Sequence, residues 1–522
     1  MPISPFSAAG QVGLNFDVAP AEMVPQAWNV GENIRFDNGS VTPVRGDVSL
    51  GLDLSSSEQP IWAFVVSESI YTTVAWVLPA APKVYAYYNG TLSDITRVSG
   101  DYTGDNYDRW SGGTLSSLLF LTNGVDVPQY WADLNPATPL VDLPNWQAGV
   151  YTKCLRSFKN FLIALDVTKA SVRYRTMVKW SHPADPGLPP PSWDETDTTK
   201  DAGEYSLTES AGACVDAVPL RDALIIYKED SVWGMQFIGG TFIFRFYKIF
   251  SSFGMPQRDC AVEFQSGQHL VFSGDDLILH DGTTFISVAD GKVRLLLRQI
   301  SIEQYAGCYM VNHIAQHEVW FCFRRASDGL PQADTALIYD WKDKTFGIRN
   351  LDNLYTIQPG KIPPFVLQWV QATYPWLNSS QEWDELARTS SIPRLFGVAD
   401  LDIRWLDVTS YLGEAAKVER TYLGVAMRAG EAPDLASRKF LTRIWPRISG
   451  VSNEVVLVTI GAVDAVDKAI RWSSPRQYII GTTEKLDFTI QGKMFAIRLS
   501  SLNAHNWVFS GADSDIAFIG GN

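Results

Sequence analysis

The feature of this sequence that most constrains its fold is a short apolar run that returns at a nearly regular interval. Runs bounded by turn residues start at Leu118, Phe161, Leu224, Leu270 and Val319, at intervals of 43, 63, 46 and 49 residues. The runs are rich in β-branched and aromatic residues and are too short for helices. They therefore predict a series of buried strands.

The one long interval contains a Pro- and acid-rich stretch, residues 182–204. Without about 20 of these residues, the interval approaches the ~40–50 residues of a four-stranded propeller blade. A blade cannot bury both of its faces alone, so blades stack around an axis. The repeats lack the signatures of WD40 and kelch units. The sequence therefore predicts an all-β fold with a divergent β-propeller, and a series of β-sandwiches is the alternative.

The pattern changes near residue 360. A Pro-containing stretch leads to a predicted short helix, Ser380 to Arg388, with Ser380 as its cap. Longer alternating strands follow and predict a separate antiparallel β domain, called here the platform domain. We expect three parts: an N-terminal β segment (1–50) that packs on the platform or the propeller, a propeller-like repeat domain (51–360) and the platform domain (361–522).

The balance of charge is acidic, with a formal net charge of −14 and a pI near 5.0. Binding to a phosphate backbone needs clustered Lys and Arg that displace counterions, and the aromatic residues are not interleaved with cations in any one segment. Acidity of this kind favours solubility. It also suits a surface along which DNA slides without sticking.

The cysteines and the apolar segments bear on the compartment. Five cysteines are odd in number and lack CxxC spacing, which favours buried, reduced thiols over a disulfide framework. The first residues show no basic stretch followed by an apolar core, and no apolar run reaches 18 residues. We expect a chain that folds in a cytoplasm without membrane insertion. The cysteines are Cys154, Cys214, Cys260, Cys308 and Cys322.

Catalytic and metal-binding motifs are missing from the sequence. It contains no GxSxG, no phosphate loop with GK[ST] and no HExxH. His313 and His317 stand four residues apart in what reads as a strand, where they would lie about 13 Å from each other. We therefore expect no metal site there, no cofactor and no enzymatic activity.

Glycoside hydrolysis needs two carboxylates about 5–10 Å apart in a cleft, and the candidate pairs are Asp275 with Asp276 and Asp194 with Glu195. Asp275 and Asp276 read as a hairpin turn, where acids usually cap backbone amides. The acid-rich part of residues 182–204 has no EF-hand spacing and reads as a solvated loop. Long insertions often carry contact or gating functions. The candidate gate or partner-loop residues are Asp194, Glu195, Asp197 and Asp201.

The segment 27–51, AWNVGENIRFDNGSVTPVRGDVSLG, resembles the opening motif of the tail nozzle (tail tubular protein B-like) proteins of short-tailed bacteriophages, the podoviruses. Residues 37–39 read as a tight turn between two strands. Arg35 and Arg45 flank that hairpin and could pair with acids. The matching residues are Asn29, Asn33, Arg35, Phe36, Asn38, Gly39, Arg45 and Gly46.

Two further stretches carry the same resemblance. Residues 178–194 are similar to a Trp-Ser-x-x-x-Asp-Pro…Trp segment of that family, although the Pro-rich part differs. Residues 421–450 resemble the strand pair before the family's last β domain. The matching residues of the first stretch are Trp180, Ser181, Asp185, Pro186 and Trp193.

The resemblance implies a structural virion protein without catalytic or metal-binding residues. Such proteins form a homohexameric ring in the tail, below the portal and the head-to-tail adaptor protein, and assemble in the host cytoplasm. The ring extends the channel for double-stranded DNA, retains packaged DNA until ejection and anchors tail fibres or spikes. Alternative functions are a propeller-fold glycan-binding or glycan-degrading tail protein, or an adhesin.

Overall fold

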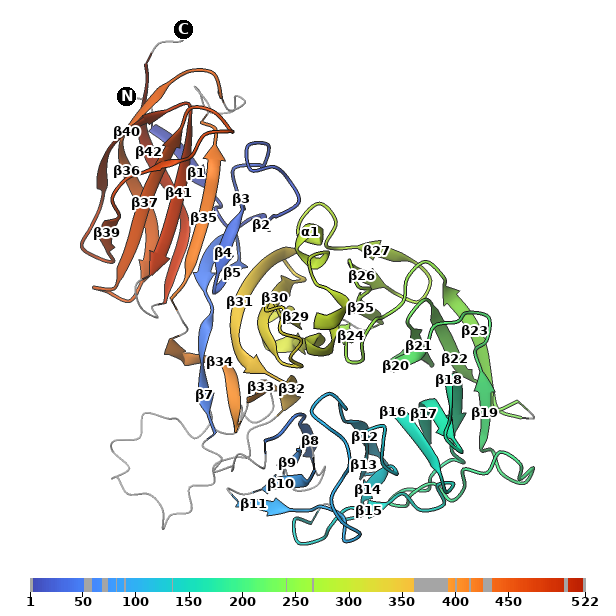
Figure 1. Ribbon diagram of the computed structural model, residues 1–522. Helices are drawn as coiled ribbons and strands as arrows, with labels where there is room; N and C mark the ends of the chain where they lie inside the picture. Colours follow the sequence, from blue (N-terminus) through green and yellow to red (C-terminus); the bar gives the residue numbers. More distant parts are fainter. Residues whose placement is uncertain are drawn as a thin grey trace, which may run out of the picture.

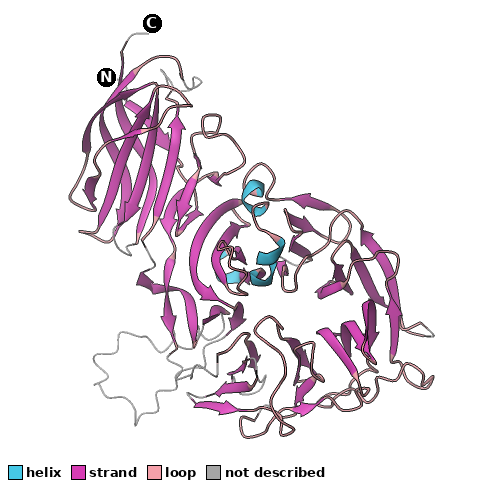
Figure 2. Cartoon of the chain, viewed as in Figure 1, coloured by secondary structure: helices cyan, strands magenta, loops and turns pink. Residues whose placement is uncertain are grey.

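The computed structural model describes residues 3–50, 59–67, 74–80, 82–88, 91–133, 135–240, 242–264, 267–360, 393–399, 401–412, 415–425, 434–501 and 506–519. The described chain is almost entirely β, with a propeller and an antiparallel platform domain (Figures 1 and 2). Short helical turns lie between strands: α1 (Arg294–Leu297), η1 (Ile302–Gly307) and η2 (Ile314–Gln316). The predicted all-β propeller with a platform is confirmed. The predicted helix at Ser380 to Arg388 lies outside the described residues.

Among the described residues, seven groups of four antiparallel strands form the blades. Blade one contains β8 (Phe64–Ser67), β9 (Val74–Pro79), β10 (Val84–Tyr88) and β11 (Thr91–Asp94). Blade two contains β12 (Ser111–Leu115), β13 (Leu118–Thr122), β14 (Gln129–Trp131) and β15 (Val141–Asp142). Blade three contains β16 (Val150–Phe158), β17 (Phe161–Lys169), β18 (Val172–Trp180) and β19 (Gly203–Ser206). Blade four contains β20 (Cys214–Leu220), β21 (Ala223–Lys228), β22 (Val232–Phe237) and β23 (Phe244–Phe250).

Blades five and six continue in chain order, whereas blade seven combines distant parts of the chain. Blade five contains β24 (Ala261–Phe264), β25 (Gln268–Phe272), β26 (Leu277–His280) and β27 (Phe285–Ser287). Blade six contains β28 (Tyr309–His313), β29 (Glu318–Phe323), β30 (Ala333–Asp340) and β31 (Thr345–Leu354). Blade seven contains β32 (Thr356–Gly360), β33 (Arg394–Ala399) and β34 (Asp402–Leu412), and its outer strand is β7 (Arg45–Ser49) from the N-terminal segment.

The first strand of each blade lies nearest the propeller axis, because the first strands of successive blades contact one another from β12 to β32, and β32 contacts β8. The apolar runs that start at Leu118, Phe161, Leu224, Leu270 and Val319 all fall in the second strand of blades two to six. The predicted period is therefore the blade period.

The expected boundary at residue 360 falls at the end of β32, inside blade seven, and the propeller sheets continue to Leu412. The strand period does not predict blade seven, because its outer strand β7 precedes the first blade in the chain. The N-terminal segment packs on both domains: β7 completes blade seven, while β4 (Val30–Glu32) joins the platform.

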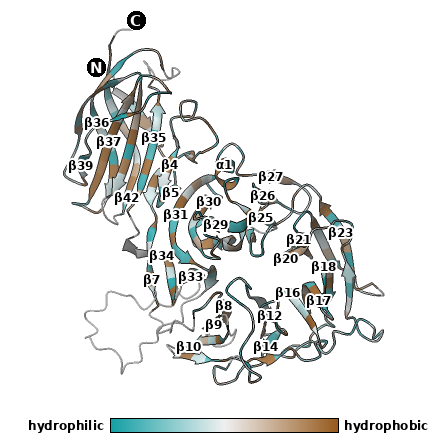
Figure 3. Ribbon diagram, viewed as in Figure 1, coloured by the Kyte–Doolittle hydropathy of each residue, from teal (hydrophilic) through white to brown (hydrophobic). Residues whose placement is uncertain are grey.

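The platform domain is built from two antiparallel sheets (Figure 1). One contains β38 (Arg471–Trp472), β37 (Val455–Val463), β41 (Met494–Ser501) and β35 (Lys417–Leu423), with β4 at one end and β39 (Arg476–Ile479) beside β37. The other contains β40 (Leu486–Gly492), β36 (Lys439–Gly450), β42 (Trp507–Phe518) and β1 (Ile3–Ser7). Figure 3 shows brown apolar residues interspersed with teal polar ones along these strands.

One hairpin connects the two domains. It consists of β5 (Ile34–Asp37) and β6 (Ser40–Pro43), and we call it the motif hairpin. Ile34 in β5 pairs with Ile348 in β31, and Val41 in β6 pairs with Phe509 in β42. These pairings join blade six and the second platform sheet into one ten-stranded sheet. A small parallel pair, β2 (Gly13–Leu14) and β3 (Ala27–Trp28), lies beside it.

Two further expectations concern the thiols and the membrane. All five cysteines are free and buried, as predicted. Within the described residues, no helix has the length and apolar character needed to span a membrane.

Candidate functional site at the junction of propeller and platform

The motif hairpin turns as its sequence predicts. Asn38 and Gly39 both adopt positive φ, at 49° and 72°. This is the backbone of a two-residue type I′ turn, for which Asn-Gly is the preferred sequence because both residues tolerate the left-handed region. Phe36 is buried in the hydrophobic core, and the backbone N–H of Asn38 donates to Asp343 Oδ2 at 2.7 Å.

Arg35 extends from this hairpin into a buried ion cluster. Its Nη1 and Nη2 donate to the two oxygens of Asp407 at 3.1 and 2.6 Å, and its Nε lies 3.6 Å from Glu318 Oε1. Burial by itself would lower the pKa of Arg35, but the two carboxylates outweigh it and raise that pKa above its ordinary value. The pKa of Asp407 is lowered for the converse reason: burial is opposed by the charge of Arg35.

The cluster extends to blade six. His313 Nδ1 lies 3.7 Å from Glu318 and 3.8 Å from Asp407. Arg349 stacks over the Trp320 ring at 5.1 Å, and its Nη2 donates to Asp47 Oδ2 at 2.5 Å. Trp320 Nε1 donates to Glu318 Oε2 at 2.8 Å. These contacts hold together the motif hairpin, β7, blade six and β34.

The other motif residues also have structural contacts. Asn33 has a positive φ of 53°, and its side-chain oxygen accepts the backbone N–H of Asn350 at 2.8 Å. The backbone N–H of Arg45 donates to Asp407 Oδ1 at 3.3 Å, and Gly46 pairs with Val408 in blade seven. Pairing with an acid was expected for Arg35 and Arg45. Arg35 meets that expectation, whereas no ion pair links Arg45 to an acid in the described part of the chain.

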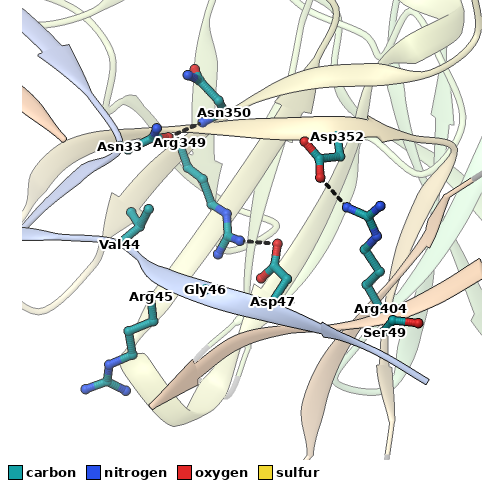
Figure 4. Close-up of a pocket in the computed structure, with 10 residues that line it drawn as sticks. All are labelled: Asn33, Val44, Arg45, Gly46, Asp47, Ser49, Arg349, Asn350, Asp352 and Arg404. Atoms are coloured by element: carbon teal, nitrogen blue, oxygen red, sulfur yellow. Dashed lines mark hydrogen bonds and ion pairs between the residues drawn. The ribbon is translucent and has the colours of Figure 1, made fainter. Parts of the chain in front are cut away.

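A cavity of about 350 Å³ lies beside this cluster (Figure 4). Two ion pairs cross it, Arg349 with Asp47 and Arg404 with Asp352, and the Arg45 side chain points away from both (Figure 4). Both lining carboxylates are paired with guanidinium groups. The cavity is a polar notch at the domain junction.

A second cavity, of about 570 Å³, lies on the platform side of Arg35. Near it, single carboxylate oxygens of Asp37, Asp340 and Asp343 lie within 4.8 Å of one another. These oxygens already have partners, since Asp340 Oδ1 accepts the backbone N–H groups of Lys342 and Asp343 at 2.8 and 3.1 Å. Burial raises the pKa of Asp340. Asp340 and Asp343 lie at the turn between β30 and β31, which supports the motif hairpin, and Asp37 ends β5 of that hairpin.

Residues 182–204 follow β18 and end in the first two residues of β19, at the outer side of blade three. Trp193 is fully buried and meets the Trp146 ring edge-on at 4.5 Å. Trp180 Nε1 donates to the carbonyl oxygen of Asp201 at 2.8 Å, and Asp185 is exposed. The backbone N–H of Gly187 donates to the carbonyl of Ser116 in blade two at 3.1 Å. The segment therefore packs across blades two and three.

The four acids of this segment do not form one site. Glu195 accepts hydrogen bonds from Lys179, Lys169 and Gln147 at 2.6, 2.9 and 2.8 Å. Burial raises the pKa of Glu195, but the hydrogen bonds from the two lysines outweigh it and hold that pKa below its ordinary value. Asp194 and Asp197 each cap the backbone N–H two residues later, at 2.9 Å.

The propeller axis is crossed by arginine side chains that sequence analysis did not single out. Arg109, just before β12 of blade two, donates to the carbonyl oxygens of Cys308 (3.0 Å) and Ala306, just before β28 of blade six. Arg258, just before β24 of blade five, donates to the carbonyls of Lys153 in blade three (2.5 Å) and Trp110 (3.1 Å). These blades are not neighbours in the ring, so the contacts pass across its centre.

A third arginine ties three successive blades together. Arg156 of blade three donates to Asp216 of blade four at 2.8 and 3.0 Å and to Asp259 at 2.9 Å. Four cysteines lie close to these arginines in the ring of inner strands. Cys154, Cys214, Cys260 and Cys308 all lie on, or directly before, an inner strand. Arg156 and Arg258 lie on or directly before two of these strands, β16 and β24.

The remaining candidate residues are the two histidines, His313 and His317, and the two acids, Asp275 and Asp276. His313 ends β28, the turn η2 follows it, and His317 has a positive φ of 59° and packs on Trp341. The expected strand context is wrong, because a hairpin turn lies between the two histidines. Asp275 and Asp276 lie in the turn between β25 and β26, as predicted. Asp276 accepts the N–H of Leu277 at 2.8 Å.

Neither the comparison with protein-family models nor the search of curated proteins finds a match for this chain. Solved structures that align with it include BBS1N in complex with ARL6DN (9% identity, TM-score 0.41, 70% of this chain and 99% of that chain). Another is the AfRom2 CNH domain, with 8% identity, a TM-score of 0.38, and coverage of 70% of this chain and 99% of that chain. A third is YCF48 from Cyanidioschyzon merolae, with 10% identity, a TM-score of 0.35, and coverage of 70% of this chain and 98% of that chain. None of these three proteins is described as a tail nozzle protein. The assignment as a β-propeller with a platform domain follows from the strand order itself.

Proposed function

We propose that this chain is a structural virion protein, the tail nozzle of a short-tailed bacteriophage. In this proposal, copies of the chain form a closed ring, expected to be hexameric, below the portal and the head-to-tail adaptor protein. The ring extends the DNA channel, retains packaged DNA and anchors tail fibres or spikes. The chain performs no catalysis in this role and needs no cofactor.

The observation that carries the proposal is the position of the residues on which the family resemblance depends. Asn33, Arg35 and Gly46 lie in or beside the junction between propeller and platform, and Arg35 is held by Asp407 at its centre. Asn33 and Arg35 form hydrogen bonds within the protein, and two ion pairs cross the polar notch that Asn33 and Gly46 line. A motif that holds two domains in a fixed arrangement supports the proposal of a structural role, in which the shape of the protein matters.

The arginine contacts across the propeller axis bear on the path of DNA. Arg109 and Arg258 link opposite blades, so side chains occupy the centre of the propeller. In the proposed ring the DNA therefore passes between copies of the chain. The net charge of −14 supports a channel of this kind, because like charges keep a polyanion from binding to its wall.

Electron cryomicroscopy of virions purified from a lysate that contains this protein tests the proposal. We expect density for the propeller and platform in a ring coaxial with the portal and the DNA. Density on peripheral appendages, or a tail channel built entirely from other chains, would contradict the proposal. Glycan binding and glycan hydrolysis would then be assayed next.

A further inference from the structure

A long stretch of blade four contains no acidic residue. Between Asp230 and Asp259 the charged residues are Arg245, Lys248 and Arg258, all of them cations. This stretch stands out in a chain whose net charge is −14. It includes the hairpin formed by β22 and β23, the two outer strands of the blade, at the rim of the propeller beside β19 (Figure 1).

Large apolar side chains are exposed at the tip of this hairpin. Phe242 is 75% exposed, Ile238 53% and Phe237 38%. Lone exposed apolar residues are common on protein surfaces, but several that share one turn mark an interaction site. We call Phe237, Ile238 and Phe242 the apolar tip.

The apolar tip is held in place from its base. Phe244 is buried and packs against Phe161 and Trp180, at ring distances of 4.9 and 5.4 Å. Gly239 and Gly240 have φ of +69° and +79°, and the N–H of Ile238 donates to the carbonyl of Ile243 at 3.1 Å. Phe237 packs on Phe161 at a ring distance of 5.7 Å, whereas Ile238 and Phe242 are exposed to solvent.

Cations without acidic partners flank the apolar tip. Lys159 Nζ lies 5.0 Å above the Phe237 ring, and Arg245 is exposed on β23. Neither of them forms an ion pair with an acid in the described portions of the chain. Lys248, farther along β23, pairs with Glu209 at 3.1 Å.

We propose that the apolar tip docks on an anionic lipid surface. Phe242 and Ile238 enter the boundary between headgroups and acyl chains, while Lys159 and Arg245 contact the negative headgroups. Apolar residues next to unpaired cations are the combination that binds such surfaces. A stable protein partner would need about 800 Å² of complementary surface on each side, whereas a fluid bilayer adapts to a small tip. This inference goes beyond the proposed nozzle function and does not depend on it.

Flotation of the full chain with lipid vesicles tests the proposal. One set of vesicles contains phosphatidylglycerol and phosphatidylcholine in equal parts, and the other contains phosphatidylcholine alone. We expect binding to the anionic set and a loss of roughly tenfold in binding for the double variant Ile238→Ser and Phe242→Ser. Lys159→Gln with Arg245→Gln should lower binding to the anionic vesicles several-fold and leave the neutral set unchanged.

A matched control uses other exposed apolar residues. Val98 and Ile302 are 88% and 81% exposed and lie outside the hairpin, so Val98→Ser with Ile302→Ser should bind vesicles as the unaltered chain does. The proposal is overturned if the unaltered chain does not float with anionic vesicles, or if the tip variant floats equally well. It is also overturned if the tip variant changes the sedimentation coefficient without lipid, because the tip is then a contact between proteins.

Discussion

Arg35 illustrates how a single buried charge can hold two domains together. Moving a guanidinium group out of water is costly, and the cost is offset only while its carboxylate partners stay in place. Asp407 lies 372 residues farther along the chain and Glu318 lies on another blade. The charged Arg35 side chain can therefore be buried at low cost only when the motif hairpin, blade six and blade seven are correctly assembled.

We predict that Arg35→Met lowers the free energy of unfolding by about 3–5 kcal/mol, because it leaves two buried carboxylates without their main counter-charge. Urea denaturation measures the change. The control is Lys83→Met, which removes an exposed pair with Asp94 at 3.0 Å and should cost no more than about 1 kcal/mol. Equal losses for the two variants would show that the Arg35 cluster is not a structural link.

A second buried group, at the seam of blades four and five, has a defined direction of hydrogen bonding. Tyr227 Oη lies 2.7 Å from both His269 Nδ1 and His280 Nε2. The carbonyl of Pro219 can only accept from His269 Nε2, at 2.8 Å, and the N–H of Gly282 donates to His280 Nδ1, at 3.2 Å. His280 therefore donates to Tyr227, and Tyr227 donates to His269. Both imidazoles are neutral in this arrangement.

We predict that acid weakens this seam. Burial lowers the pKa of His269 to about 4 and that of His280 to about 3, from an ordinary value of 6.5. Below pH 6.5 the unfolded chain takes up protons that the folded chain does not, so stability falls as the pH decreases toward 4. At pH 4.5 each of these two imidazoles should lower the free energy of unfolding by about 2–3 kcal/mol relative to pH 7.

Urea denaturation between pH 7 and pH 4.5 checks this prediction by comparing the unaltered chain with His280→Gln. The glutamine keeps a hydrogen-bond donor but does not titrate, so the variant should lose less stability on acidification. Identical losses in the two proteins would contradict the role assigned to His280.

At the scale of elements, the Pro- and acid-rich segment 182–204 packs against blades two and three and connects them. Its buried Trp193 fills a site between blades two and three, and Glu195 neutralises Lys179, whose side chain is fully buried. The sequence predicts a solvated loop with a possible gate. The structure shows that Glu195 and Trp193 are packed, while Asp194 and Asp185 are exposed. A gate or partner contact at the exposed acids stays a prediction.

We predict that Glu195→Gln lowers the free energy of unfolding by about 3 kcal/mol, because Lys179 then keeps only Glu204, at 3.5 Å, as its counter-charge. Asp194→Asn, in the same segment but exposed, should change it by no more than about 0.5 kcal/mol. Chemical denaturation of both variants measures the difference. An unchanged stability for Glu195→Gln would favour a purely solvent-facing role for the segment.

At the scale of the whole molecule, the N-terminal segment makes two domains into one body. Strand β4 adds to one platform sheet, the motif hairpin joins blade six to the other, and β7 completes blade seven. Neither domain has all of its strands without residues 30–49. The two domains are therefore interlocked by strand pairing and by the Arg35 cluster.

We predict that propeller and platform unfold in a single cooperative transition. Calorimetry of the full chain should show one peak, because loss of the N-terminal strands from one domain removes them from the other. Far- and near-ultraviolet circular dichroism should report the same midpoint. Two separated peaks would show that the strand exchange between the domains contributes little to their stability.

The sequence by itself determined the properties that depend on neighbours along the chain. The strand period, the Asn38-Gly39 turn, the capping role of Asp276 and the burial of the cysteines all follow from local residue types and their spacing. These features could be predicted because turn preferences and apolar periodicity act within a few residues.

Only the tertiary structure decided which distant residues meet. It placed β7 on blade seven, Arg35 against Asp407, and Arg109 and Arg258 across the propeller axis. An edge strand can pair with many other strands, and an arginine with many carboxylates or carbonyls. The local sequence does not distinguish among these partners. Ring closure and the exclusion of water at the junction select one of these partners, and a single sequence contains no local signal for that selection.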